Sequence, residues 1–271
     1  MTTGSQAVNA RAPSQVRRLV LAVTFLTGLP VPLHGDADEA DLWGSMGWYP
    51  LVGLGLGSVG WLLYAGSLWL VTPAVAAVLT VALLELATRA LHLDGLMDTC
   101  DGYFSGRSRE RALEIMKDSR VGAMGVVGAL AVVLLKVTAL ASLGRHGAVV
   151  PLLVGWTAAR TLSPIDVRAF RYARDEGTGA PFAGGRSAGP LVLAAASCVA
   201  AALVVGALVA GAAGAAGALL LVGATMGIAL LAQVGVGRRL GGLTGDVYGA
   251  GVELVEAFAL VAGCVAVTRG W

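Results

Sequence analysis

The sequence predicts an all-α protein, a polytopic transmembrane helical bundle with about seven crossings and a short re-entrant or interfacial N-terminal segment. Of the 271 residues, 56% are apolar and only 13% are charged, which is about half the charged share of a soluble domain. The apolar residues fall in blocks of about 20, the length at which a helix crosses a bilayer. Strand-like alternation is missing from these blocks, and lipid leaves no partner for unpaired backbone groups. Helical spans are therefore expected.

The blocks that are long enough to cross follow one another along the chain. They are residues 47–70, 73–91, 121–143, 148–163, 190–211, 213–234 and 248–268. An earlier apolar stretch, Leu19–Val31, is too short for a hydrocarbon core of about 30 Å. It ends at Pro30 and Pro32, so we expect it to lie in the interface or to re-enter its own side. Residues 1–13 are small and polar and predict a flexible tail, followed by a single integral membrane domain over residues 14–271.

Basic residues predict the topology, because short cytoplasmic loops collect Lys and Arg. With the tail inside and seven crossings, the basic loops 92–120, 164–189 and 235–247 all face the cytoplasm. The opposite side keeps Arg145 and Arg269. We therefore expect a multi-pass protein of the cell's inner (plasma) membrane. The net charge of +2, from 19 basic and 17 acidic residues, is too balanced to indicate nucleic-acid binding.

The densest polar segment is HLDGLMDTCDG at residues 92–102. Asp94, Asp98 and Asp101 are spaced i, i+4, i+7, which places three carboxylates on one face of a helix. Like charges on one stripe repel each other, and a hard cation such as Mg²⁺ removes that repulsion. We predict that these residues hold magnesium; the alternative is a solvated acidic face. His92 is a candidate base, or a side chain that forms a hydrogen bond at the membrane interface.

A second cluster mixes acids and bases. Glu114 and Asp118 are four residues apart, with Lys117 and Arg120 beside them. A metal–phosphate site needs carboxylates for the metal and cations for the remaining phosphate oxygens. Lys117, Asp118 and Arg120 are therefore candidate catalytic residues, although ordinary helix-surface ion pairs produce the same pattern.

A third cluster begins with RRLGGLTGD at residues 238–246 and continues with acidic residues inside an apolar run. Asp246, Glu253 and Glu256 share one helical stripe, and an ionisable group within a span indicates a functional site. We expect Arg238, Asp246 and Glu253 to contribute to substrate binding. Arg174, in a loop rich in basic and aromatic residues, is a further binding candidate; the alternative is that this loop only contributes to the positive charge of the cytoplasmic side.

Other predicted spans also contain charged residues. Glu85 and Arg89 are four residues apart and are expected to neutralise each other. Lys136 has no expected partner.

Six motifs resemble those of the cobalamin synthase family, also called adenosylcobinamide-GDP ribazoletransferase. They are FLTGLPVP at 25–32, WYPLVGLGLG at 48–57, HLDGLMDTCDG at 92–102, RALEIMKDSRVGAMG at 111–125, YARDEGTG at 172–179 and GGLTGDVYGAGVELVE at 241–256. The resemblance implies a membrane enzyme in which a hydroxyl of α-ribazole, or of its 5′-phosphate, attacks the cobinamide-linked phosphorus of adenosylcobinamide-GDP. It also implies that GMP leaves and that Mg²⁺ is required. Met97 departs mildly from the family pattern, which often has Ala there.

Two other functions compete with this interpretation. A CDP-alcohol phosphotransferase also uses an Asp-Gly stripe and a divalent metal, but Met97 and Asp98 stand where that family has an Ala-Arg pair. A cation transporter could line an ion path with Glu253 and Glu256, although no inverted repeat is visible. The expected partners are adenosylcobinamide-GDP, α-ribazole or its 5′-phosphate, and membrane lipid. The sequence makes no prediction of oligomeric state.

Overall fold

The computed structural model describes residues 14–32, 37–174, 176–177, 182 and 187–270. The predicted tail, residues 1–13, lies outside the described residues. Within them, regular structure consists of helices and one isolated bridge between Tyr172 and Leu243, which confirms the all-α prediction. The helices are α1 (Gln15–Leu26), α2 (Glu39–Met46), α3 (Tyr49–Ser67), α4 (Pro73–Ala87), α5 (Leu91–Phe104), α6 (Arg109–Ile115), α7 (Ala123–Gly147), α8 (Val149–Ala169), α9 (Gly189–Leu240) and α10 (Gly245–Thr268).

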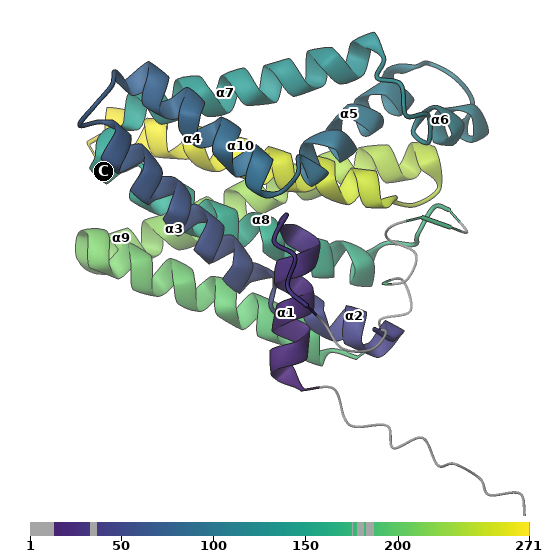
Figure 1. Cartoon of the computed structure of the whole chain (residues 1–271), viewed down its shortest axis with the longest axis horizontal. Helices are drawn as coiled ribbons and strands as arrows, with labels where there is room; N and C mark the ends of the chain where they lie inside the picture. Colours follow the sequence, from purple (N-terminus) through teal and green to yellow (C-terminus); the bar gives the residue numbers. More distant parts are fainter. Residues whose placement is uncertain (1–13, 33–36, 175, 178–181, 183–186, 271) are drawn as a thin grey trace, which may run out of the picture.

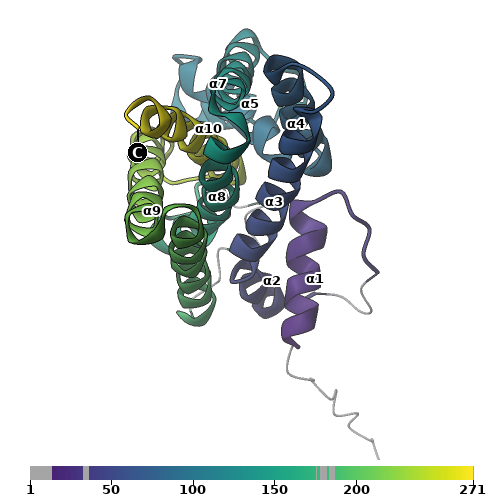
Figure 2. The same cartoon turned by 90° about the vertical axis from the view of Figure 1, so that its left-hand side faces the viewer.

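The long helices form a bundle with α8 at its centre. This helix packs against α3, α9 and α10, and most of its residues between Pro151 and Val167 are buried. Helices α5 and α6 lie at one end of the bundle and the chain ends at the other (Figure 1). In the perpendicular view, α1 and α2 lie at the edge of the bundle beside α3 (Figure 2).

Small residues allow α3 and α8 to approach closely. A Cβ atom at Gly53 would collide with the backbone carbonyl of Trp156, and one at Gly57 would collide with that of Leu152. Glycine at both positions therefore lets the two backbones pack against each other, as small residues do between membrane helices.

Four helices of the described chain, α3, α7, α9 and α10, are long and apolar enough to cross a membrane. Helices α4 and α5 would make a fifth span if counted together, but they are bent by 90°. The element α9 is broken at Ala210 and Gly211, so its two arms correspond to the predicted blocks 190–211 and 213–234. Helix α8 is not among the described helices that pass; polar and charged residues such as Arg160 and Asp166 lower its mean hydropathy. The described helices thus include several candidate membrane spans, but they do not confirm the number seven.

The first part of the segment Leu19–Val31 belongs to a short helix, α1, which is not among the described helices long enough to span a membrane. Helix α1 has 12 residues, starts after Ser14 and leaves its helical path at Thr27. It is held by its neighbour α2, where Arg17 Nε lies 2.8 Å from Asp41 Oδ2. The N-terminal segment is therefore part of the folded bundle.

A sharp bend between α4 and α5 sets the direction of the acidic motif. Arg89 and Ala90 both have positive φ, 55° and 53°, a backbone region that residues other than glycine rarely adopt. This strained turn produces the 90° bend. Such strain persists where surrounding packing maintains it, and it is frequent beside functional sites.

Candidate active site

The acidic face of α5 lies against the start of α10. Gly95 makes this approach possible, because a Cβ atom there would lie 2.7 Å from the carbonyl oxygen of Asp246. Asp98 consequently experiences the negative charges of both Asp94 and Asp246. Carboxylates from two helices that are far apart in the sequence therefore gather at one place.

Arg174 brings a cation to this group. Its Nη1 atom lies 2.8 Å from Asp246 Oδ2, and its side chain is only 9% exposed. The Nε and Nη2 atoms are also buried and find no hydrogen-bond partner among the described residues. A guanidinium with buried, unused N–H donors is suited to bind a phosphate or carboxylate oxygen.

The backbone positions Arg174 beside the α9–α10 turn. Ala173 N donates to Leu243 O at 2.8 Å, and Leu243 N donates to Arg171 O at 2.9 Å. These two bonds tie the loop after α8 to the residues that precede Asp246. The ion pair between Arg174 and Asp246 therefore follows from the backbone pairing.

Asp101 has a different environment from the other acidic residues of α5. Its Oδ2 accepts from Gly122 N and its Oδ1 from Gly125 N, both at 2.7 Å. A carboxylate at a helix N-terminus satisfies free N–H groups and complements the helix dipole. Asp101 thus attaches the start of α7 to α5. Its role as a metal ligand stays a prediction.

The second cluster forms ion pairs at the surface. Arg120 Nη2 lies 2.7 Å from Asp118 Oδ2 and Nε lies 3.0 Å from Oδ1, while Arg111 pairs with Glu114 at 2.6 Å. The hydrogen bonds from Arg120 lower the pKa of Asp118 from 3.8 to about 2. Lys117, Asp118 and Arg120 are all exposed. Their loop lies near the acidic face because Asp101 anchors it, and their catalytic role stays a prediction.

The basic loops meet at one end of the bundle. Arg109 Nε donates to Leu240 O at 2.7 Å, and its Nη2 donates to Ala173 O at 3.3 Å. Arg239 Nη2 donates to Arg107 O at 3.3 Å. The three loops that were predicted to share one side are therefore in contact. Arg238, in the last turn of α9, is exposed at the same end.

A second polar group lies deeper in the bundle, around Lys136. The Lys136 ammonium lies 3.0 Å from Glu85 Oε1, 2.8 Å from Glu253 Oε2 and 2.5 Å from Glu256 Oε2. Arg160 forms a further ion pair with Glu256. We call these five residues the buried ion network. Lys136, Arg160, Glu253 and Glu256 are buried almost completely.

This network corrects one expectation and qualifies another. The predicted neutralisation of Glu85 by Arg89 is wrong, because Glu85 contacts Lys136 from the neighbouring α7. Glu253 lies in the network and not beside Asp246, so the two residues that were expected to act together occupy separate polar groups. The substrate-binding role of Glu253 stays a prediction.

Three acidic side chains of the network lie close enough together to be considered as a metal site, with one carboxylate oxygen from each within 4.8 Å of the others. This group, Glu85, Glu253 and Glu256, is the one such set in the described part of the chain. Lys136 contacts all three carboxylates and supplies the positive charge that they require. Asp94 and Asp98 form no such compact set in the described residues, either with Asp101 or with Asp246.

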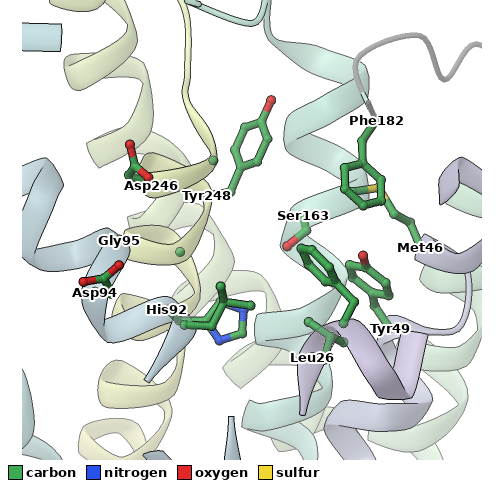
Figure 3. A pocket seen from close by; sticks show the side chains of 14 residues that line it. Leu26, Met46, Tyr49, His92, Asp94, Gly95, Ser163, Phe182, Asp246 and Tyr248 are labelled. Carbon is green, nitrogen blue, oxygen red and sulfur yellow. The ribbon is translucent and has the colours of Figure 1, made fainter. Parts of the chain in front are cut away.

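A cavity of about 110 Å³ opens between the acidic face and the N-terminal helices. In Figure 3, His92, Asp94 and Asp246 lie on one side of it, with Leu26, Met46, Tyr49 and Phe182 on the other. His92 is buried in this wall. The remaining lining residues are Phe25, Leu91, Gly95, Ser163, Gly245, Tyr248 and Gly249.

The comparisons with known proteins identify the family. A family model described as cobalamin-5-phosphate synthase matches residues 18–264. The chain belongs to this family. An adenosylcobinamide-GDP ribazoletransferase of Brevibacillus brevis is 38% identical over 242 residues, which cover 89% of this chain and 94% of the relative. One from Desulfitobacterium hafniense is 41% identical over 250 residues, with 91% and 96% covered. One from Escherichia coli O17:K52:H18 is 38% identical over 250 residues, with 89% and 96% covered.

No solved structure matches the chain. The family match confirms the resemblance that the six motifs carry, and with it the prediction of an enzyme of cobalamin biosynthesis, a transferase. The membrane helices agree with this assignment. The cation-transporter alternative finds no support in the buried ion network, where Lys136 and Arg160 hold the glutamates that were to line its path.

Several residues of this cobalamin-5-phosphate synthase family member were not singled out as site residues from the sequence. Arg109 fastens two loops of the site, and Arg160 contacts the buried ion network. Tyr49 and Phe182 line the cavity. Arginine within a predicted span was an available signal for Arg160. The aromatic residues carried no signal, since such side chains are common in membrane helices.

Proposed function

We propose that this chain transfers the adenosylcobinamide-phosphate moiety of adenosylcobinamide-GDP to α-ribazole or α-ribazole 5′-phosphate, with release of GMP. The product is adenosylcobalamin or its 5′-phosphate. The family match and the names of the relatives support this reaction. The observation that carries it is the group of three carboxylates, Asp94, Asp98 and Asp246, beside the buried and partly unpaired guanidinium of Arg174.

The donor set around Asp98 fits Mg²⁺. Magnesium prefers oxygen ligands and commonly binds one or two carboxylates together with substrate phosphates. Asp94, Asp98 and Asp246 supply such oxygens from two helices, and their mutual repulsion favours a cation. Bound magnesium would neutralise charge on the diphosphate and stabilise the departing GMP. Asp101, with both oxygens on α7, would support the site by fixing α5.

The side chains of the chain itself position the phosphate and the proton. Arg174 would bind a non-bridging phosphate oxygen through Nε and Nη2, while Asp246 keeps its Nη1 in place. A hydroxyl oxygen of the acceptor then bonds to the cobinamide-linked phosphorus, and the bond from that phosphorus to the bridging oxygen breaks. His92 lines the cavity and is our candidate for the base that receives the hydroxyl proton. Phosphoryl transfer relies mainly on such positioning and electrostatic stabilisation.

We further propose that the site faces the cytoplasm from the inner membrane. The contacts among the three basic loops support this orientation, because they gather the Lys and Arg residues at the end of the bundle that holds the site. The end with Arg145 is opposite, where Trp61 Nε1 donates to Arg145 O.

The test is an assay of the purified, detergent-solubilised chain with adenosylcobinamide-GDP, α-ribazole and MgCl₂, in which released GMP is measured by chromatography. Asp94→Asn, Asp98→Asn and Asp246→Asn are each expected to lower turnover by about 10²-fold or more, the effect of losing one preorganised electrostatic contact. Glu39→Gln, an exposed acid on α2, is the matched control. Wild-type turnover in all three Asn variants at limiting magnesium, or no GMP from the wild type, would refute the proposal.

A further inference from the structure

Two N-terminal motifs are not explained by the phosphate chemistry, because neither contains a charged residue. FLTGLPVP begins with Phe25, and WYPLVGLGLG contains Tyr49. The structure brings these two residues together: their rings stack with centroids 5.9 Å apart and planes 13° apart. Phe182 adds an edge-on contact to Phe25 at 5.4 Å. Three distant parts of the chain thus build one aromatic wall of the cavity.

This aromatic wall faces the acidic side of the same cavity. Figure 3 shows Tyr49 and Phe182 across from His92, Asp94 and Asp246. At about 110 Å³, the cavity is smaller than the roughly 300–1,000 Å³ typical of sites that enclose a whole drug-sized ligand. It therefore suits one ring system of a larger substrate whose remainder extends toward the carboxylates.

The Tyr49 hydroxyl indicates what that ring system must offer. Tyr49 is 1% exposed, and its hydroxyl finds no hydrogen bond of normal geometry among the described residues. Its polar neighbour Ser45 donates its own proton to Leu42 O at 2.7 Å. A buried hydroxyl without a partner is energetically unfavourable. The Tyr49 hydroxyl is therefore available to donate a hydrogen bond to an acceptor atom of a molecule bound in the cavity.

We propose that the cavity binds the flat aromatic base of the acceptor nucleoside, with the base against Phe25 and Tyr49 and its free ring nitrogen accepting a hydrogen bond from the Tyr49 hydroxyl. This inference rests on the proposed function, which supplies a benzimidazole nucleoside as acceptor. Aromatic side chains give such a base its stacking and edge-on contacts. The ribose of the acceptor would then extend toward Asp94 and Asp246.

The guanine of the donor nucleotide is a second planar aromatic base that could occupy the cavity. Guanine presents several donors and acceptors along its edges, and each buried one needs a partner. The wall around Tyr49 is completed by the apolar side chains of Leu26, Met46 and Phe182. The dimethylbenzimidazole of α-ribazole has one free ring nitrogen and two methyl groups. The nitrogen can accept a hydrogen bond from the Tyr49 hydroxyl, and the methyl groups can contact the apolar side chains.

The experiment measures equilibrium binding of radiolabelled α-ribazole to the purified chain in detergent, without adenosylcobinamide-GDP and without magnesium. Phe25→Ala is expected to weaken binding by about 10-fold or more, the loss of about 1.4 kcal/mol of stacking. Tyr49→Phe keeps the ring and is expected to weaken binding by about 5-fold, through loss of the hydroxyl alone. Phe104→Ala removes a ring that is 58% exposed on α5 and is expected to leave binding unchanged. Thermal melting of each variant verifies that it is folded.

Unlabelled guanosine separates the two sources of the base. The proposal expects 5,6-dimethylbenzimidazole to displace α-ribazole and guanosine not to do so. Displacement by guanosine alone, or undiminished α-ribazole binding in folded Tyr49→Phe and Phe25→Ala, would overturn it.

The transfer assay keeps this outcome distinct from that of the proposed function. If GMP is released but binding is insensitive to both substitutions, the cavity assignment falls and the reaction stands. If binding depends on Tyr49 and no GMP is released, the reaction falls and the cavity assignment stands. Where both hold, the KM for α-ribazole should rise in Tyr49→Phe, with the KM for adenosylcobinamide-GDP unchanged.

Discussion

Replacing Lys136 with methionine tests the buried ion network directly. The Lys136 side chain is 0% exposed and its ammonium contacts three carboxylates, from Glu85, Glu253 and Glu256. It also lies 5.7 Å from the ring centroid of Trp156. Methionine fills similar space without charge. The substitution therefore leaves the buried Glu253 and Glu256 and the partly buried Glu85 with Arg160 as the one remaining cation of the network.

The expected cost follows from the loss of this central charge. Breaking a buried ion pair by removing one partner costs about 3–5 kcal/mol, because the other charge stays buried and uncompensated. For a chain of this size, each kcal/mol lost from the free energy of unfolding lowers the melting temperature by about 2–4 °C. The melting temperature of Lys136→Met should therefore fall by roughly 6–20 °C. The second substitution Glu253→Gln, which removes one of the stranded carboxylates, should recover part of that loss.

The assay is thermal melting of the detergent-solubilised protein, followed by circular dichroism, for wild type, Lys136→Met, Lys136→Met/Glu253→Gln and a control. Lys117→Met is the control, since Lys117 is exposed and its replacement should shift the melting temperature by about 2 °C or less. The cycle of single and double variants isolates the coupling between lysine and glutamate. The reasoning would be refuted if Lys136→Met had the same melting temperature as Lys117→Met, or if the double variant were less stable than Lys136→Met.

Three further predictions concern the polar end of the bundle. Asp101→Ala removes the acceptor of two α7 backbone N–H groups and should lower the free energy of unfolding by about 1–2 kcal/mol. Asp101→Asn should lower it less, and chemical denaturation measures both. The Arg120 hydrogen bonds lower the pKa of Asp118 from 3.8 to about 2, so its charge stabilises the fold above pH 3.8 and that contribution is lost as pH falls through 2. Acid melting curves of Asp118→Asn should lack this small step, and an identical curve would contradict it. With the native cysteines replaced, Ser108→Cys should react with a membrane-impermeant thiol reagent in inverted vesicles; labelling of intact cells would reverse the proposed topology.

The sequence predicted the helical class and the positions of most helices because apolar block length is a local property. The separation of blocks 190–211 and 213–234 was also predicted, and it corresponds to the break at Ala210 and Gly211 within α9. The number of crossings was not predictable in this way. Helix α8 is buried by other helices, so its composition reflects protein contacts as well as lipid.

The candidate site was only partly readable for the same reason. Helical spacing correctly indicated that Asp94 and Asp98 lie close together, but it could not show that Asp246 joins them from α10 and pairs with Arg174. Spacing cannot show that Asp101 attaches to the start of α7, because that contact joins residues 21 and 24 positions apart. The partner of Lys136 lies still further along, at Glu253 and Glu256. Such pairings depend on how helices pack, which a single sequence does not display.

The cavity takes its walls from opposite ends of the chain, and this arrangement imposes an order on biogenesis. Phe25 and Tyr49 leave the ribosome early, while Asp246 and Tyr248 arrive with the last helix. Until α10 has entered the membrane, Lys136 also lacks Glu253 and Glu256, and a nascent bundle contains an ammonium without its full set of counterions. A chain that stops before α10 therefore lacks one wall of the cavity and contains an ionised side chain without its partners, which is costly in lipid. Completion of the last helix and formation of the cavity become a single event.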